Sequence, residues 1–577
     1  MLRLSVLAAL LAAQAAFSGM VPSSCAQDGS CTAKLQAALT GCFGSSAPCT
    51  VDLEPGATYP LDGPEMRSCI VSAAQSSSNP VPPPSFTFNG NGAELVLHPL
   101  SGFICLGGLS NVLVRNFTLD MVRQPYSLGR VVSSSASESV LIVDSDAYPH
   151  ATPSGSSWTN VVQAILQYDP AADRPAAKGT DIYALKPNAL SAAWAPGPNA
   201  SAASLTVSHG HLPVGSWQIM RHQVYSLNGL TLGGVRSVTI EDVTIYSVPG
   251  MGIVSDQSSD ITLRRVQVRK RAGRPMSITA DAVHLTSCRG GDVHIDQCLF
   301  EGQGDDGGNI PSRYWEARGI SPDRKTLTLW QRGAQVPFQG QPGDELLFYG
   351  RTSFGAYGRG GGVRVASIDA AAGTLTMTAP LPAGGAVWDL VLNLANQPRS
   401  ITVRDTVYRA NRARGLLLKA SDVAVVNCTF DHNTGPAIRV VPDGAMWFEG
   451  DVVSRGNWTL RDSRIVGVNY ATAANPGDVT FGAEGPVFKD GVPTKAGAQV
   501  ARGTQHFNVT VENNTFEQDV GQAAVSAFGI EGLRATGNTV TSTTGRPAAN
   551  FLLSSSCSKS TVSDNVCSPG PCTTAGA

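Results

Sequence analysis

The sequence carries no excess of charge of either sign and has few charged residues. Its 577 residues include 42 Lys and Arg against 44 Asp and Glu, and charged residues make up 15% of the chain. Proteins that bind nucleic acid need basic surfaces to match the phosphate charge, and this balance offers none. We therefore expect no nucleic-acid partner.

Zinc-binding cysteine pairs are also missing. None of the 12 cysteines stands in a C-x-x-C pair, which favours disulfides in an oxidising compartment over a metal site. Bridges should hold the two ends of the chain, although the spacing does not fix their pairing. Cys288, Cys298 and Cys428 lie in apolar alternating stretches, where a buried free thiol is an equal alternative. The terminal clusters are Cys25, Cys31, Cys42, Cys49, Cys69 and Cys105, and Cys557, Cys567 and Cys572.

No apolar run beyond the first residues approaches the roughly 20 residues that a membrane span requires. The chain begins MLRLSVLAALLAAQAAFSG, in which Arg3 precedes an apolar run and then small residues. This pattern predicts a cleaved signal peptide over residues 1–19, and the C-terminal SPGPCTTAGA is too polar for a lipid-anchor signal. We predict a secreted protein without membrane insertion, with the cell wall as one possible location. Acceptor triplets for N-glycans agree with secretion and occur at Asn116, Asn199, Asn427, Asn457, Asn508 and Asn513.

What the sequence does contain is a repeat of β-branched residues. SVTIEDVTIYS, DITLRRVQVRK, DVHIDQCLFEG, SITVRDTVYRA, DVAVVNCTFDH, NWTLRDSRIVG and NVTVENNTFEQ share one pattern, a short strand, a turn and a second short strand. Ile240 and Leu263 are 23 residues apart, and Val403 and Val425 are 22 apart. This period suits one rung of a parallel β-helix and is too short for a helical hairpin repeat.

Two stretches interrupt the repeat with short strands and Gly or Pro turns, and each predicts a small antiparallel barrel inserted between rungs. CTAKLQAALTGCF, residues 31–43, predicts an amphipathic helix over the open end. The fold class is therefore all-β, a right-handed parallel β-helix with two inserted β-barrels. The predicted parts after the signal peptide are the cap and first rungs (20–123), the first barrel (124–223), rungs with an acidic site (224–313), the second barrel (314–397) and the C-terminal rungs (398–577).

Two acids stand side by side among glycines in FEGQGDDGGNI, residues 300–310. A polar turn is the common meaning of such a stretch. However, Asp281 lies 24 residues before Asp305 and 25 before Asp306, close to one rung, so these acids should stack on one exposed wall. Strand alternation would let only one of the pair share the face of Asp281, unless the glycines bulge the backbone.

Clustered carboxylates raise at least one pKa, which can provide both an acid and a base for glycoside hydrolysis. Asp281 and the acidic pair are expected to stand a residue or two out of exact register. This offset slightly favours the wider separation of carboxyl groups that inverting glycosidases have.

A longer ordered set of motifs surrounds these acids. GMGIVSDQSSDITLRRVQV, SITADAVHLTSC, GQGDDGGNI, an insert, NRARGLLLKASDVAVVNCTF and MWFEGDVV follow one another. This order resembles glycoside hydrolase family 110, the α-1,3-galactosidases, over more than half of the chain. The resemblance implies a parallel β-helix with barrel inserts, no metal or other cofactor, and release of terminal α-linked galactose with inversion.

Carried onto this sequence, the resemblance implies catalytic roles for Asp281, Asp305 and Asp306. Two departures put substrate identity in question: Pro311 and Ser312 replace the usual His-Gly, and FEGD replaces YESG. Glu345, in the second insert, is a further candidate acid. The implied substrate contacts are His284, Asn309, Arg412, Arg414, Trp447 and Glu449.

Each substrate contact also has a plainer interpretation. His284 alone would be a hydrogen-bonded rung residue, and Arg412 and Arg414, alternating on a strand, would form an exposed basic ladder. Glu449 would be an ordinary turn acid. Beside Trp447, whose ring suits the apolar face of a sugar, a binding role for Glu449 is favoured.

Our leading hypothesis is a secreted, exo-acting, inverting α-galactosidase that acts on a galactose-terminated oligosaccharide or polysaccharide and uses no cofactor. One alternative is another β-helix polysaccharide enzyme, such as a polygalacturonase-like hydrolase or a lyase. The other is a noncatalytic glycan-binding β-helix of the cell wall. A uronate lyase would use Lys or Arg as base and often calcium, and the acidic pair lacks calcium-loop spacing. The oligomeric state stays open, with a dimer as one option.

Overall fold

The computed structural model describes residues 17–43, 47–74, 83–150, 158–185, 187–225, 227–330, 338–351, 355, 357, 362–420, 422–444, 447–450, 456–471, 476–489, 492–500, 506–518, 523–544 and 551–576. Residues 1–16 of the predicted signal peptide lie outside these ranges. Residues 17–19 lie inside strand β1 (Phe17–Val21), which pairs in parallel with β2 (Cys49–Leu53). Cleavage after residue 19 would divide this strand, whereas cleavage before Phe17 would leave it whole.

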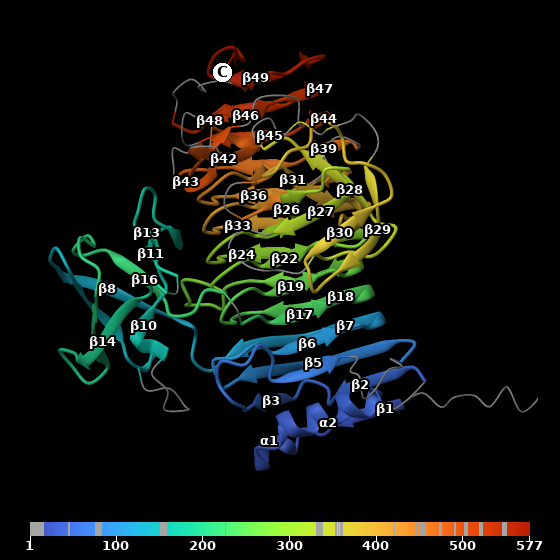
Figure 1. The fold of residues 1–577 in the computed structure, drawn as a ribbon. Helices are drawn as coiled ribbons and strands as arrows, with labels where there is room; N and C mark the ends of the chain where they lie inside the picture. The colour runs from blue at the N-terminus through green and yellow to red at the C-terminus, as the bar shows by residue number, and fades with distance from the viewer. Residues whose placement is uncertain are drawn as a thin grey trace, which may run out of the picture.

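Two long parallel sheets wind together into a solenoid that rises from the N-terminal to the C-terminal end (Figure 1). The larger sheet, sheet A, contributes up to two short strands to each rung, and the smaller sheet B contributes one. Sheet A comprises β1, β2, β3 (Thr58–Leu61), β5 (Phe86–Leu97), β7 (Ser110–Met121), β18 (Arg236–Ile245), β20 (Ser259–Arg264), β21 (Gln267–Val268), β23 (Asp292–Asp296), β24 (Leu299–Glu301), β32 (Ser400–Arg404), β33 (Val407–Arg409), β35 (Val423–Val426), β36 (Thr429–Asp431), β39 (Trp458–Arg461), β40 (Arg464–Val466), β44 (His506–Glu512), β45 (Thr515–Gln518), β47 (Ile530–Thr536), β48 (Thr539–Ser542), β50 (Thr561–Ser563) and β51 (Val566–Ser568). Sheet B comprises β4 (Val71–Ala74), β6 (Ile104–Gly107), β17 (Leu230–Gly233), β19 (Ile253–Asp256), β22 (Val283–Thr286), β25 (Gly308–Ile310), β34 (Leu416–Leu418), β37 (Ile438–Val440), β41 (Gly477–Phe481), β46 (Ala523–Phe528), β49 (Leu552–Ser555) and β52 (Thr574–Gly576).

The register of the rungs follows the repeat in the sequence. Ile240 pairs with Leu263, and Val403 pairs with Val425, as the repeat predicts. Alternate side chains of each strand point inward, and these form one continuous apolar core from Val21 to Leu552. A single rung cannot bury its apolar face alone, so the stacking of rungs stabilises the whole column. The predicted fold class, an all-β parallel solenoid with antiparallel barrel, is confirmed.

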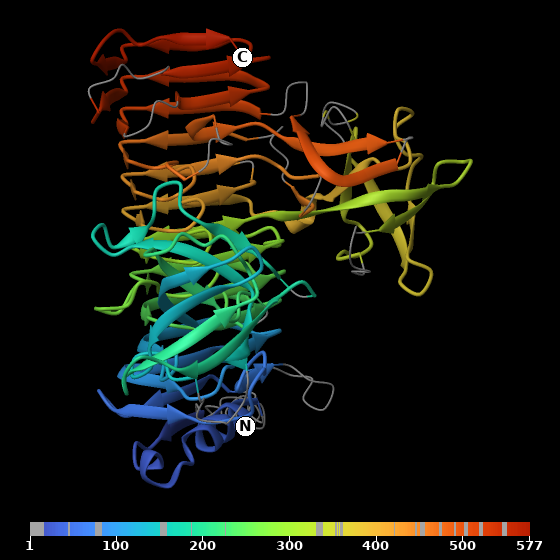
Figure 2. The same ribbon diagram turned by 90° about the vertical axis from the view of Figure 1, so that its left-hand side faces the viewer.

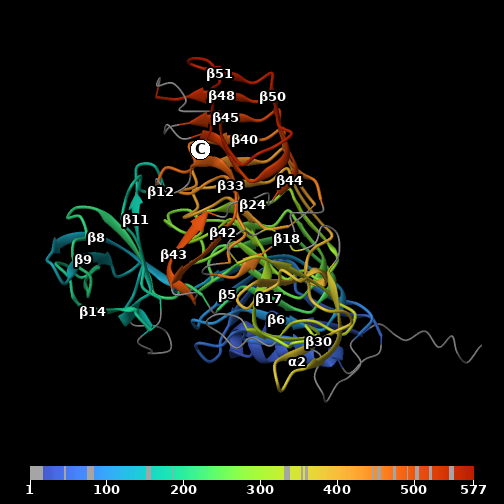
Figure 3. The same cartoon turned by 45° about the horizontal axis from the view of Figure 1, so that its top comes forward.

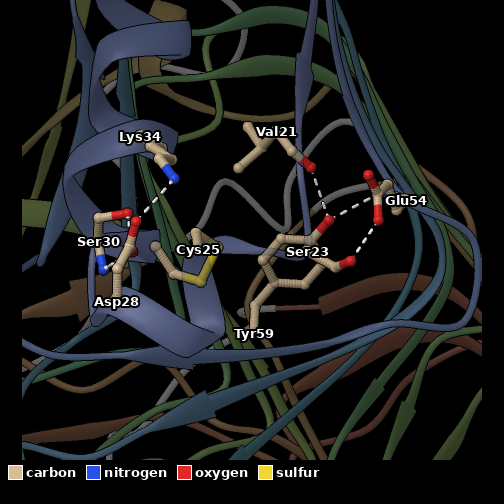
Figure 4. Close-up of a disulfide and its surroundings, with 9 residues drawn as sticks. Val21, Ser23, Cys25, Asp28, Ser30, Lys34, Glu54 and Tyr59 are labelled. Atoms are coloured by element: carbon tan, nitrogen blue, oxygen red, sulfur yellow. Dashed lines mark hydrogen bonds and ion pairs between the residues drawn. A yellow bond between two sulfur atoms is a disulfide. The ribbon is translucent and has the colours of Figure 1, made fainter.

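A helical cap covers the N-terminal end of the core. Helix α2 (Cys31–Phe43) spans the segment predicted to be helical, and its Leu35 and Leu39 are buried. It follows the short helix α1 (Cys25–Asp28). Near these helices, Tyr59 donates a hydrogen bond of 2.7 Å to the carbonyl oxygen of Val21 (Figure 4). Disulfides hold both ends of the solenoid, as expected: Cys25–Cys31, Cys42–Cys49, Cys69–Cys105 and Cys567–Cys572. The free cysteines among the described residues are Cys288, Cys298 and Cys428, all buried, and Cys557.

The first insert stands to one side of the solenoid, where it faces the viewer in Figure 2. Its strands pair antiparallel in the order β14-β15-β9-β8-β16-β11, and β10, just before β11, pairs back to β14 and closes the barrel. It has its own apolar core, which includes Leu141 and Ile219. Its strands are β8 (Tyr126–Ser134), β9 (Ser139–Asp144), β10 (Val161–Val162), β11 (Ala164–Asp169), β12 (Arg174–Pro175), β13 (Asp181–Tyr183), β14 (Leu190–Pro196), β15 (Ala202–Val207) and β16 (Trp217–Arg221), and the short helix η1 (Trp158–Asn160) precedes β10.

The second insert is a closed antiparallel barrel of six strands, since β26, at one end of the path β27-β30-β29-β28-β31-β26, also pairs with β27. Figure 3 shows that the two inserts lie on different sides of the solenoid. Strand β38 (Glu449–Gly450) pairs with the start of β26 and so ties a later part of the chain to this barrel. The barrel strands are β26 (Ser312–Ile320), β27 (Thr326–Trp330), β28 (Glu345–Tyr349), β29 (Val363–Asp369), β30 (Thr374–Met377) and β31 (Leu390–Asn393), followed by the short helix η2 (Leu394–Asn396).

The remaining strands, β42 (Glu484–Lys489) and β43 (Val492–Val500), form a separate antiparallel pair. Among the described residues, no helix combines the length and the apolar character needed to cross a membrane.

Candidate active site

Three successive rungs place charged residues at the turn that leads into sheet B. Val283 pairs with Gly308, and Gly308 pairs with Leu416. Two residues before these positions stand Asp281, Asp306 and Arg414, which therefore share one register. We expected Asp281 to be out of register with both acids of the pair. This expectation is wrong for Asp306 and holds only for Asp305, so the register offset no longer supports inversion.

Glycines let this turn stack tightly between its neighbours. A Cβ on Gly304 would lie 2.4 Å from the carbonyl oxygen of Thr279, and one on Gly307 would lie 2.6 Å from that of Gly415. Asp305 and Asp306 therefore occupy a turn and not a strand. Because strand alternation does not apply there, both carboxyl groups face the same cavity.

The acids are buried, which corrects the expectation of an exposed wall. Asp281, Asp305 and Asp306 are 4%, 6% and 2% exposed. They line a cavity of about 360 Å³ between the solenoid and the first insert, which contributes Tyr183. The three catalytic candidates and the six implied substrate contacts all line this cavity. The full lining is Tyr183, Tyr225, Met251, Asp281, His284, Asp305, Asp306, Asn309, Arg412, Arg414, Leu417, Trp447 and Glu449.

Asp305 is surrounded by hydrogen-bond donors. Tyr183 and Tyr225 donate to its Oδ2 at 2.7 Å and 2.5 Å, and Arg412 donates to its Oδ1 at 3.0 Å. Burial raises the pKa of this carboxyl group, but Arg412, Arg414 and the two phenols outweigh burial, so the pKa lies below its usual range. Asp305 is therefore the ionised member of the pair.

Asp306 has the opposite electrostatic environment. Its Oδ1 accepts a hydrogen bond from the backbone nitrogen of Arg414 at 2.9 Å and lies 3.0 Å from the Nε of the same residue. Burial raises its pKa to about 7; Arg414 opposes this shift, and the charges of Asp305 and Asp281 add to it. Two adjacent carboxyl groups thus have pKa values pushed apart, as in sites that need an acid and a base together.

On the other side of the acids, His284 contacts Asp281 and interacts electrostatically with Glu449. His284 Nδ1 lies 2.8 Å from Asp281 Oδ2. Burial lowers the pKa of His284, but Asp281 and Glu449 outweigh it, so the pKa is raised. Glu449 pairs with the buried Lys419; burial opposes ionisation, yet Lys419 and His284 hold the pKa of Glu449 below its usual range.

Arg412 and Arg414 do not lie on a strand, which corrects the expectation of an exposed basic ladder. They occupy the bend before β34, with Ala413 between them at a φ of +78°. This left-handed conformation turns both guanidinium groups toward the acids. The carboxyl groups of Asp281, Asp305 and Asp306 offer oxygens within 4.8 Å of one another, but the two arginines already neutralise this cluster, and we assign no metal to it.

Trp447 lies at the rim of the cavity with 59% of its surface exposed. The neighbouring Glu449 is fixed by the pairing of β38 with β26. Glu345 does not line the cavity, since it accepts a hydrogen bond from the backbone nitrogen of Gly362 at 2.7 Å and lies 3.5 Å from Arg364. Glu345 is therefore no candidate for the acid.

Sequence analysis missed four residues of the lining: Tyr183, Tyr225, Met251 and Leu417. Tyr225 lies in GSWQIMRHQVYSLNG, upstream of the motifs that carry the family resemblance, and an extension of those motifs to this stretch could have drawn attention to it. Tyr183 lies in the first barrel, 122 residues before Asp305, and no local pattern marks it.

The curated proteins that are similar to this chain are named alpha-1,3-galactosidase A or B. The chain is 24% identical over 395 residues to "Alpha-1,3-galactosidase B" of Bacteroides thetaiotaomicron, covering 64% of this chain and 62% of the relative. It is 24% identical over 450 residues to the protein of that name from Akkermansia muciniphila, covering 74% and 53%. "Alpha-1,3-galactosidase A" of Bacteroides fragilis is 25% identical over 487 residues, covering 80% and 75%.

The chain is thus similar to proteins named α-1,3-galactosidase over 64–80% of its length. This confirms the resemblance to family 110 drawn from the motifs. The match spans little more than half of the Akkermansia relative and about three fifths of the Bacteroides thetaiotaomicron one. No family model matches the chain.

Similar solved structures include the Agl-KA catalytic domain, with a TM-score of 0.39, 10% identity and coverage of 95% of this chain and 65% of that one. The family 28 exopolygalacturonase of Yersinia enterocolitica has a TM-score of 0.38, 10% identity and coverage of 95% and 78%. We draw no functional conclusion from likenesses this distant.

Proposed function

We propose that this protein is a secreted, exo-acting glycosidase that releases terminal α-1,3-linked galactose with inversion at the anomeric carbon. The observation that supports this most strongly is the buried carboxyl cluster, in which Asp305 is held ionised and Asp306 has a pKa of about 7. Glycoside hydrolysis needs one carboxylic acid and one carboxylate beside the scissile bond. The names of the relatives supply the sugar and the linkage.

In the proposed reaction, Asp306 donates its proton to the glycosidic oxygen as the bond to the anomeric carbon breaks. Asp305, assisted by Asp281, takes a proton from a water molecule that attacks this carbon from the opposite face. The products are free galactose and an alcohol on the leaving sugar. Asp306 ends the cycle ionised and Asp305 protonated, so one proton must pass between them or through solvent before the next turnover.

Substrate contacts come from the other wall of the cavity. The side-chain oxygen of Asn309 is buried and has no hydrogen-bond partner among the described residues, so it is available to accept one from a sugar hydroxyl. In this proposal Glu449 and His284 bind neighbouring hydroxyls, and the exposed ring of Trp447 packs against the apolar face of a sugar at the entrance.

We include secretion in the proposal. The signal segment and the four disulfides support it. All six acceptor asparagines for N-glycans are exposed, so each is accessible to a glycan.

The test is incubation of the purified protein with aryl α- and β-galactosides, α-1,3-galactosyl oligosaccharides and polygalacturonate. Release of galactose from α-linked ends alone is the expected result. Cleavage of polygalacturonate, or binding without cleavage, would support one of the two alternative functions instead.

Proton NMR of the first product tests the stereochemistry. Retaining enzymes hold two carboxyl groups about 5–5.5 Å apart and inverting ones about 6.5–9.5 Å apart. One oxygen atom from each of the three carboxyl groups lies within 4.8 Å of the others, a closest approach that favours neither range, so inversion rests on the family resemblance. β-Galactose appearing first supports the proposal, and α-galactose appearing first contradicts it.

A further inference from the structure

One residue of the first barrel reaches into the carboxyl cluster. Tyr183, at the end of β13, lies between two guanidinium groups: Arg221 lies 4.6 Å and Arg412 lies 4.2 Å from the centre of its ring. Arg221 is fully buried, and no carboxylate of the described residues lies within ion-pair distance of it. The tyrosine therefore stands between two cations beside Asp305.

The hydrogen bonds of Tyr183 fix the direction of its hydroxyl group. Arg221 and Arg412 each donate to the hydroxyl oxygen, at 3.1 Å and 3.0 Å. Both lone pairs are then occupied, so the single hydrogen must point elsewhere. Asp305 Oδ2 lies 2.7 Å away, whereas the carbonyl oxygen of Gly304 lies 3.2 Å away and already accepts from Arg221 at 2.5 Å. The hydroxyl hydrogen thus goes to Asp305.

From these contacts we propose that Tyr183 is a positioning residue that keeps Asp305 ionised and correctly oriented, which makes the first barrel part of the catalytic machinery. The inference rests on the proposed function, because it assigns Tyr183 to the base of that reaction. Tyr183 touches no reacting atom in this scheme. It acts through Asp305, and the hydrogen bond that it accepts from Arg221 polarises the hydroxyl group that it donates to that carboxylate.

The groups that face Asp305 agree with this role. Tyr225 donates to the same oxygen, and Arg412 occupies the other, while Arg414 adds positive charge. Asp281 and Asp306 are the other carboxyl groups that face it, and the charge of Asp305 helps to raise the pKa of both. Asp181 pairs with Arg412 at 2.9 Å and holds it in place. Burial raises the pKa of Tyr183 well above its usual value, so the phenol keeps the hydrogen that it donates.

The test is Tyr183→Phe, which keeps the ring between the two guanidinium groups and removes only the hydroxyl. We expect kcat/KM to fall about ten- to hundredfold, the effect of one hydrogen bond to a charged group. Because loss of a donor raises the pKa of Asp305, the acidic limb of the pH profile should move to higher pH. Tyr148→Phe is the control, since Tyr148 is a buried tyrosine of the same barrel that stacks on Arg123, away from the cavity.

An unchanged acidic limb in Tyr183→Phe, or the same shift in Tyr148→Phe, overturns the inference even if the wild-type enzyme releases galactose. If the wild-type protein cleaves no glycoside, the proposed function fails, and stability then tests the inference. A carboxylate with a lowered pKa adds stability that is present above its unfolded pKa and is lost as pH falls through its folded pKa. The rise in Tm from low to neutral pH should therefore be smaller in Tyr183→Phe, and an equal rise overturns the inference.

Discussion

Arginine and acidic side chains meet both on the outer face of sheet A and in the cavity, with different consequences. On sheet A, Arg265 forms two hydrogen bonds of 2.7 Å to Asp242, and both side chains are more than 40% exposed. In the cavity, Arg414 lies 3.0 Å from Asp306, whose side chain is 3% exposed. The partners and distances are similar, and burial is what differs.

This difference explains why only one of the two regions can carry out acid-base chemistry. The hydrogen bond from Arg265 lowers the pKa of Asp242 further, so it stays ionised at every ordinary pH. Asp306 is removed from water and lies close to two other carboxyl groups, so its pKa rises to about 7. A carboxyl group can act as a proton donor near neutral pH only in the second environment.

The largest effect that would test this contrast is on turnover. We expect Asp306→Asn to lower kcat by about 10²- to 10⁴-fold, the range for loss of a general acid or base. Asp242→Asn, the matched change on sheet A, should leave kcat unchanged. Steady-state kinetics of both variants on an α-1,3-galactosyl oligosaccharide provide the measurement. Wild-type turnover in Asp306→Asn would remove this residue from the mechanism.

The second test separates the two members of the acidic pair by stability. A protonated Asp306 resembles asparagine, so Asp306→Asn should change Tm little. Asp305→Asn leaves buried positive charge uncompensated, and we expect a loss of about 3 kcal/mol, the lower end for a broken buried pair, because Asp181 still pairs with Arg412. Urea unfolding of both variants at pH 5, where Asp306 is protonated and Asp305 ionised, measures this. Equal losses would contradict the assignment of charge.

The sequence alone predicted the solenoid well, because the rung pattern repeats locally. Ile240 and Leu263 pair as their spacing indicated, and α2 begins and ends where the apolar spacing of residues 31–43 placed a helix. It also named acids, arginines and an aromatic residue that the fold brings to one cavity. The rung spacing and the motifs contained this information.

Burial and long-range contacts could not be predicted in the same way. The acids were expected on an exposed wall, because Gly-Asp stretches usually form surface turns. The strands of both barrels were recognised, but a strand pattern does not tell which side chain of an insert meets the solenoid. Tyr183 and the pairing of β38 with β26 depend on how folded units pack together.

The third test is the basic limb of the pH profile. In the proposed reaction Asp306 donates a proton, so it must be protonated. Its raised pKa means that this form is present below about pH 7 and is lost as pH rises. We expect kcat/KM to fall about tenfold per unit above that pH. Asp242→Asn should not move this limb. Constant activity from pH 6 to 9 would exclude Asp306 as the donor.

The smallest expected effect concerns an ion pair on sheet A. Arg464 and Glu517 lie on adjacent rungs and form two contacts, Nε to Oε1 at 2.8 Å and Nη2 to Oε2 at 3.0 Å, with the Arg464 side chain about half exposed. Solvent screens such a pair, so Glu517→Gln should lower stability by only about 0.2–1 kcal/mol. The difference should shrink further in 1 M NaCl, where the screening length is about 3 Å. Urea unfolding of Glu517→Gln and wild type at low and high salt measures both effects. If Glu517→Gln lost as much stability as Asp305→Asn, and the loss did not depend on salt, surface pairs would stabilise this solenoid as strongly as buried ones. The contrast between sheet A and the cavity would then not hold.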